Sequence, residues 1–128
     1  MMVDLLANAL NAIKVSEAKG KHVILVPASK LIKETLGILK REGYIGEFEF
    51  LDDGKSGSIR IPLLGKVNGC GAVTPRHSVR KDEWEKWEQR YLPARNVGIV
   101  VVSTSKGLMT NVDARAASLG GKLIAFVF

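Results

Sequence analysis

Three hydroxyl side chains stand next to each other at Ser103, Thr104 and Ser105, directly after a β-rich apolar stretch. Each hydroxyl can donate and accept a hydrogen bond, and a buried strand before them would hold them rigidly. Such groups can contact base edges, ribose hydroxyls and phosphates in the shallow minor groove of RNA. Lys106 adds charge, and Gly107 allows close backbone approach. On pattern alone an ordinary loop of turn-forming residues is the favoured interpretation, and a polar RNA-binding surface is the hypothesis that the surrounding features support.

A second basic feature is a stripe of cations along one side of a helix that Ser29 is expected to begin. The stripe consists of Lys30, Lys33, Lys40 and Arg41. It could contact phosphates, but exposed lysines on a helix usually mark only a solvated face.

Catalytic and metal chemistry find little support in the residue inventory. One cysteine and two histidines cannot supply the ligands of a zinc finger. Cys70 could pair with His77 as a nucleophile, but nothing nearby orients such a pair, so we expect a buried small apolar residue. The nucleophile-elbow motif requires glycine where Ser103 stands, and phosphate-loop motifs are missing. We therefore expect no enzymatic activity, no metal, no cofactor and no small-molecule substrate.

Composition favours a folded, basic protein. The chain has 128 residues, 46% of them apolar, and a formal net charge of +6. A field of this sign attracts polyanions, nucleic acid first. The apolar stretches fall far short of the roughly 20 residues of a membrane helix, the N-terminus does not resemble a signal peptide, and the single cysteine fits a reducing compartment. We expect a cytoplasmic protein without membrane contact.

Two helices are expected in the first half. Apolar residues recur at three- to four-residue spacing between Asp4 and Gly20, which predicts a helix. Asp4 can cap its beginning, and the helix should end near Gly20. Ser29 opens the second helix, and Gly43 supplies a left-handed stop.

Three strands complete this half. The apolar run over 22–27 suits a buried strand, and the alternation over 47–50 suits a half-buried one. The turn Asp52-Asp53-Gly54 predicts a hairpin whose second arm is 58–62. The order is helix, strand, helix, strand, strand.

A change of amino-acid composition after residue 64 predicts a domain boundary, because closely spaced glycines begin at Gly65 and are followed by Pro75. The fold class is α/β with two small, tightly packed domains. We predict an N-terminal α/β domain over 1–64 and a C-terminal, mostly β, RNA-binding domain with short helices over 65–128.

The C-terminal half is expected to contain two short helices. Asp82 and Glu85 resemble an acidic capping box, and Trp84, Trp87 and Tyr91 follow at helical spacing. This spacing favours packing into a core over stacking on bases.

The last residues predict strand, helix and strand. The strand over 97–102 precedes a cap at Thr110 and a helix over 114–119, which the turn Gly120-Gly121 ends. A strand over 123–128 closes the chain.

Residues 103–128, STSKGLMTNVDARAASLGGKLIAFVF, closely resemble the C-terminal signature of the universal small-subunit ribosomal protein family S-eight. Residues 27–45, PASKLIKETLGILKREGYI, are similar to the second helix of that family and its turn. The segment over 82–96, DEWEKWEQRYLPARN, is similar to archaeal and eukaryotic cytosolic members. The resemblance covers essentially the whole chain.

The resemblance implies a structural constituent of the small ribosomal subunit in the cytoplasm. It implies direct binding to the central domain of small-subunit ribosomal RNA, a role in assembly, and neighbouring small-subunit ribosomal proteins as partners. The minor groove of an internally looped RNA helix is the implied target of the hydroxyl loop. The expected RNA-binding residues are Lys30, Ser103, Thr104, Ser105, Lys106, Gly107, Gly120, Gly121 and Lys122.

The sequence departs from the family at a few positions. Ala116, Ala117 and Ser118 stand where relatives often have two basic residues and a glycine, and Lys122 stands where many bacterial members have Glu. A general RNA chaperone or translational regulator using the same surface is the alternative function, and an enzyme using Ser105 or Cys70 is a more distant one.

Overall fold

The computed structural model describes residues 5–52, 54, 57–73, 76–94 and 97–128. These residues form two compact units, Met1–Cys70 and Gly71–Phe128. The predicted domain ranges 1–64 and 65–128 put the boundary slightly earlier in the chain, and they stay predictions. Asp4, Asp53 and Pro75, on which parts of the sequence analysis relied, lie outside the described residues.

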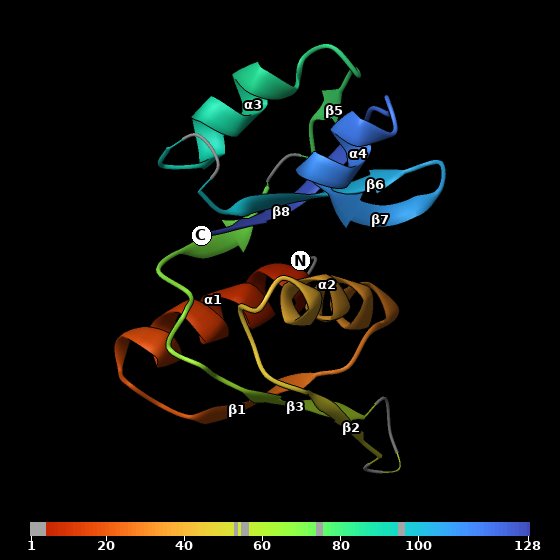
Figure 1. The fold of residues 1–128 in the computed structure, drawn as a ribbon. Helices are drawn as coiled ribbons and strands as arrows, with labels where there is room; N and C mark the ends of the chain where they lie inside the picture. The colour runs from red at the N-terminus through yellow and green to blue at the C-terminus, as the bar shows by residue number, and fades with distance from the viewer. Residues whose placement is uncertain (1–4, 53, 55–56, 74–75, 95–96) are drawn as a thin grey trace. The chain divides into compact units, whose positions relative to one another are not determined.

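The first unit contains two helices and a three-stranded antiparallel sheet. In chain order these are α1 (Leu5–Ala18), β1 (Val23–Pro27), α2 (Lys30–Arg41), β2 (Glu49–Leu51) and β3 (Ser58–Pro62). The order in the sheet is β1-β3-β2, and both helices lie on one face of it (Figure 1). The predicted order of helices and strands is confirmed.

The ends of α2 follow the local signals of the sequence. The Ser29 side chain accepts a hydrogen bond from the amide of Ile32 at 3.1 Å. After the helix, Gly43 has φ of +83°, and the amide of Tyr44 donates to the carbonyl of Leu39 at 2.9 Å. A side-chain N-cap and a left-handed glycine satisfy the backbone groups that a helix leaves unpaired at its ends. Both predicted ends are confirmed.

The burial predicted for two strands of this unit is wrong. Leu25 in β1 is 63% exposed and Phe50 in β2 is 46% exposed, although both lie in runs that looked buried or half-buried. Both strands are edges of a sheet that the helices cover on one face only. The central strand β3 supplies the core positions instead, since Ile59 and Ile61 are fully buried.

The second unit is mostly β. Its elements are β4 (Cys70–Ala72, which begins at the last residue of the first unit), β5 (Ser78–Val79), α3 (Trp84–Tyr91), β6 (Ile99–Thr104), β7 (Gly107–Thr110), α4 (Asn111–Ala116) and β8 (Gly121–Val127). The sheet order is β4-β8-β6-β7, and β5 pairs with β8 (Figure 1). Strands β4, β5 and β7 were not predicted, because their two to four residues show no alternation of apolar and polar side chains such as the one that predicted β2.

Trp84 forms the centre of the core of this unit. It is 2% exposed and packs with Val100, Val102 and Leu123. Its indole nitrogen donates a hydrogen bond to the carbonyl of Leu119 at 3.0 Å, as a buried tryptophan requires. The predicted core position of Trp84 is confirmed, as are those of Trp87, which is buried, and Tyr91, which is partly buried against the same cluster.

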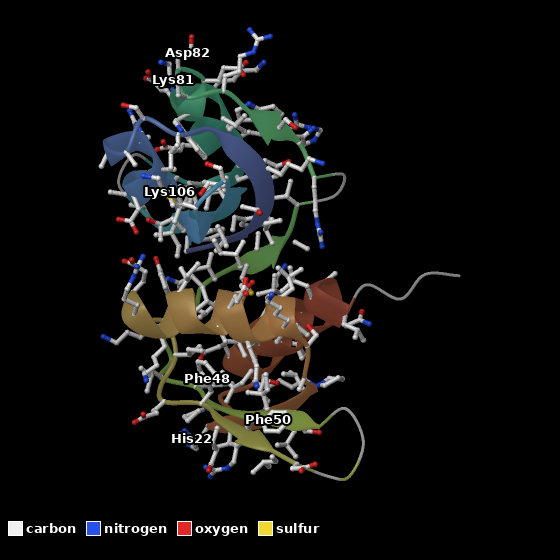
Figure 2. The ribbon with its side chains drawn as sticks, turned by 90° about the vertical axis from the view of Figure 1, so that its right-hand side faces the viewer. His22, Phe48, Phe50, Lys81, Asp82 and Lys106 are labelled. Atoms are coloured by element: carbon white, nitrogen blue, oxygen red, sulfur yellow. The ribbon has the colours of Figure 1, made fainter. Side chains whose placement is uncertain are left out.

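The predicted capping box of α3 is wrong. The residue before the helix is Glu83, and no side chain caps the first turn. The Glu83 carboxylate instead accepts a hydrogen bond from the amide of Arg80 at 3.0 Å, in the connection where Figure 2 labels Asp82. The backbone at Glu83 has φ of −106° and ψ of 6°, whereas a capping residue usually adopts an extended conformation.

Helix α4 starts and ends earlier than predicted. Its expected cap is confirmed, because the Thr110 hydroxyl accepts from the amide of Asp113 at 3.1 Å. The helix begins directly after this cap and stops before Ser118, whose φ of +57° is left-handed. Ser118, and not Gly120-Gly121, therefore ends the helix. A positive φ costs a serine more than a glycine.

Asn111 provides a prediction about stability. It is 2% exposed, and its Oδ1 accepts from the amide of Val100 at 3.0 Å, one residue before the pairing of β6 with β7 begins. Asn111→Ala leaves a buried amide without an acceptor, so we expect the free energy of unfolding in urea to fall by about 1–3 kcal/mol. Val112→Ala removes a side chain that is 62% exposed and should change it by less than about 0.5 kcal/mol. Equal losses in both variants would contradict the prediction.

Candidate nucleic-acid interface

The hydroxyl segment forms the tip of a β-hairpin between β6 and β7. Thr104 pairs with Gly107, and Ser105 and Lys106 make the turn between them. The Thr104 hydroxyl donates to the carbonyl of Gly107 at 2.9 Å and accepts from the amide of Lys106 at 3.1 Å. Gly107 has φ of +104°, a conformation that favours glycine. The tip is held by its own hydrogen bonds, as recognition groups require.

The three hydroxyls have different environments. Thr104 is partly buried and its hydroxyl forms hydrogen bonds within the turn, whereas Ser103 and Ser105 are exposed. Within the described part of the chain, the side chains of Ser103 and Ser105 make no hydrogen bond. Lys106, which Figure 2 labels, follows Ser105 in the turn and is exposed. Two hydroxyls and one ammonium group are therefore available to a ligand at this tip.

A row of polar side chains crosses the sheet beside the hairpin tip. Ser78 of β5 is opposite Lys122 of β8, and Lys122 is opposite Ser103 of β6. Partners in antiparallel strands share a face, with Cβ atoms about 4.5–5.5 Å apart. All three residues are exposed. We call Ser78, Lys122 and Ser103 the hydroxyl row. It lies on the face opposite Val102, which points into the core under α3 and α4.

Sequence reasoning missed Ser78. Its strand has only two residues, and the pairing with β8 joins positions far apart in the chain. No local pattern could have indicated this partner, because strand register is a property of the folded sheet.

Gly120 and Gly121 allow β8 to approach its neighbours closely. A Cβ atom on Gly121 would overlap the carbonyl oxygen of Ser103, and one on Gly120 would overlap the carbonyl oxygen of Val79. Both obstacles are backbone atoms, which cannot move aside as a side chain can. The glycine pair is therefore required for the alignment of the hydroxyl row, even though neither glycine ends α4.

Lys30 belongs to the first unit, whereas the other eight expected RNA-binding residues belong to the second. It is the first residue of α2 and is exposed. Together with Lys33, Ser29 and Phe50 it lines a shallow hollow. The Lys33 ammonium lies 4.3 Å from the centre of the ring of Phe50, a residue of β2 that Figure 2 labels.

The basic stripe of α2 is not uniform. Lys40 forms an ion pair with Glu47, and Arg41 forms one with Glu42, each at 3.4 Å. In the described residues Lys30 and Lys33 have no carboxylate partner. The beginning of α2 therefore keeps uncompensated positive charge, and its end does not.

Charge is distributed unevenly in the second unit, because α3 and α4 hold carboxylates together with the cations Lys86, Arg90 and Arg115. In the sequence this unit has nine Lys and Arg but only five Asp and Glu. The five acids, on α3, on α4 or just before α3, are Asp82, Glu83, Glu85, Glu88 and Asp113. The hairpin tip and β8 carry only positive charge, which favours a polyanion there.

Other chemistries receive no support from the described residues. Cys70 is 6% exposed, its thiol donates to the carbonyl of Leu10 at 3.1 Å, and burial raises its pKa to about 11. A thiol with this pKa is a poor nucleophile near neutral pH. Within the described ranges, no three or more His, Cys, Asp or Glu side chains gather as a metal site would require. None of the helices described there is long and apolar enough to span a membrane.

A comparison with protein families adds to this geometry. The model of the family Ribosomal protein S8 matches residues 4–128. The chain belongs to this family. It is therefore a ribosomal protein of the small subunit that binds ribosomal RNA and functions with other ribosomal proteins in translation. The resemblance inferred from the sequence is confirmed.

The glycine pair gives a test of how this ribosomal protein builds its hydroxyl row. Gly121→Ala must move β8 away from β6, so we expect the free energy of unfolding to fall by about 1–3 kcal/mol. Gly37→Ala is the control, since Gly37 is exposed within α2 and its new methyl group would touch nothing within 4 Å. This control should gain up to about 1 kcal/mol from helix propensity. A stable Gly121→Ala variant would show that β8 does not need a glycine there.

Proposed function

We propose that this ribosomal protein binds the central domain of small-subunit ribosomal RNA directly and helps to assemble the subunit, in a ribosome of the archaeal or eukaryotic cytosolic type. The observation that carries the proposal is the exposed hydroxyl row beside a self-supported, positively charged hairpin tip. The proposed RNA-binding residues are Lys30, Ser103, Thr104, Ser105, Lys106, Gly107, Gly120, Gly121 and Lys122, with Ser78 added from the strand register.

The shape of the row favours the minor groove of RNA. Neighbouring strands are about 4.8 Å apart, so three of them spread Ser78, Lys122 and Ser103 over roughly 10 Å of one sheet face. A surface of this breadth can lie on the wide, shallow minor groove of A-form RNA, but it cannot enter the deep, narrow major groove. Serine hydroxyls can donate to and accept from ribose 2′-hydroxyls, which DNA lacks.

Lys30 is proposed to contact phosphate. It begins α2, where the helix dipole adds partial positive charge, and it has no carboxylate partner in the described residues. Its contribution should be electrostatic and independent of base identity.

Replacing Ser105 by alanine tests the hairpin contact. The substitution leaves the RNA groups that the hydroxyl contacts without a hydrogen-bond partner. Binding to a central-domain RNA fragment should therefore weaken by about 1–3 kcal/mol in a filter-binding titration. Ser58→Ala, a serine of β3 in the first unit, is the matched control and should bind as the parent does. An unchanged affinity for Ser105→Ala would remove Ser105 from the interface.

Replacing Lys30 by glutamine tests the phosphate contact. Losing one contact releases fewer counterions, so the slope of log affinity against log salt concentration should become shallower by about one. Lys40→Gln on the same helix removes the same charge from a lysine that is paired with Glu47, and its slope should match the parent. Identical slopes for Lys30→Gln and the parent across a salt series would contradict the assignment.

A further inference from the structure

A groove in the second unit runs along α3 and continues beside α4. It consists of two hollows of about 190 and 380 Å³ that share Glu88, Leu92 and Arg115 as a common wall. The first hollow extends to Glu85 and Pro93, and the second extends to Val112. We call this feature the α3/α4 groove.

Helical spacing explains why the groove follows α3. Glu85, Glu88 and Leu92 are three and four residues apart, so they lie on one side of the helix and its end. The cations of α3 occupy another side, because Lys86 and Arg90 lie over the ring of Trp87 at 5.5 and 5.4 Å. The helix therefore turns its carboxylates, and not its cations, toward the groove.

The charged groups of the common wall are paired with each other, whereas the carboxylate at the edge of the first hollow has no ion pair in the described residues. Arg115 and Glu88 form an ion pair at 2.8 Å, and the Glu88 side chain is only 18% exposed. Glu85 is exposed and has no ion pair in the described residues. The apolar part of the groove includes Leu92, Pro93 and Val112, the last of which is 62% exposed. An occupant thus meets apolar surface next to one uncompensated carboxylate.

Charge decides which class of molecule can occupy the groove. The charged side chains that line the groove are Glu85, Glu88 and Arg115, and Arg115 pairs with Glu88. The lining therefore has a formal net charge of −1, which lies at the exposed Glu85. A cationic partner suits this groove better than RNA, whose phosphates a carboxylate repels.

The volumes of the two hollows restrict the kind of molecule that can occupy the groove. Pockets for drug-sized ligands usually have about 300–1,000 Å³, and these two hollows, divided by the ion pair, fall below or near the lower limit. Two adjacent hollows fit successive side chains of an extended chain better than one compact ligand.

We propose that the α3/α4 groove docks an extended basic segment of another protein. An apolar side chain of that segment packs against Leu92 and Pro93, and a Lys or Arg pairs with Glu85. The second hollow takes a further apolar side chain against Val112. This surface is separate from the proposed RNA-binding residues, so its test is independent of theirs.

The test is a fluorescence anisotropy titration of the full chain with a short labelled peptide of alternating Lys, Arg and Leu pairs, compared with the same peptide carrying Glu in place of its cations. The basic peptide should bind saturably, and the acidic one should not. Glu85→Lys should weaken binding at least tenfold, because it replaces an attraction by a repulsion. Glu34→Lys, which reverses the charge of an exposed glutamate on α2, should change it by less than about twofold, because Glu34 does not line the groove.

Val112→Lys provides a second variant at the other hollow and should also weaken binding of the basic peptide. Circular dichroism checks that each variant is folded. The proposal is overturned if the basic peptide does not bind the parent, or if Glu85→Lys and Glu34→Lys weaken it equally. The affinity for central-domain RNA should be the same for Val112→Lys as for a variant with Lys introduced elsewhere on the surface. Failure of the groove and failure of the RNA interface therefore give different results.

Discussion

Strand β6 lies between β7 and β8, and the candidate interface depends on how closely these three strands approach one another. The approach of β8 requires Gly121, because any side chain there would meet the carbonyl of Ser103. The approach of β7 is maintained by the Thr104 hydroxyl, which bonds to both Gly107 and Lys106. One hydroxyl is used to shape the tip, and two remain available, so stability and recognition draw on different residues of the same short segment.

Packing and charge then separate two sides of the second unit. Alternation along β6 places Val102 in the core under the helices and Ser103 on the opposite face. The helices carry carboxylates together with the cations Lys86, Arg90 and Arg115, whereas the hairpin and β8 carry Lys106 and Lys122 without a carboxylate. A ribosomal protein must contact RNA and also other proteins, and this separation gives each class of partner a surface of suitable charge.

Sequence patterns predicted features whose cause is local. Ser29 and Gly43 mark the ends of α2 because caps act within a few residues, and the hydroxyl segment was visible because its members are adjacent. Exposure of Leu25 and Phe50 was not predictable, since it depends on their strands being edges. The place of Ser78 in the hydroxyl row and the need for glycine at position 121 were not predictable either. Both depend on the pairing of strands that are far apart in the sequence.

Directed hydroxyl-radical probing of reconstituted small subunits tests the central claim most directly. An iron chelate attached to a cysteine introduced at Ser105 should cleave an internally looped helix of the central domain, while the same chelate at a cysteine introduced at Glu85 should leave that helix intact. The native Cys70 thiol, buried and with its pKa raised to about 11, should resist labelling. Cleavage of the helix from position 85 but not from position 105 would show that the hairpin tip does not face the RNA.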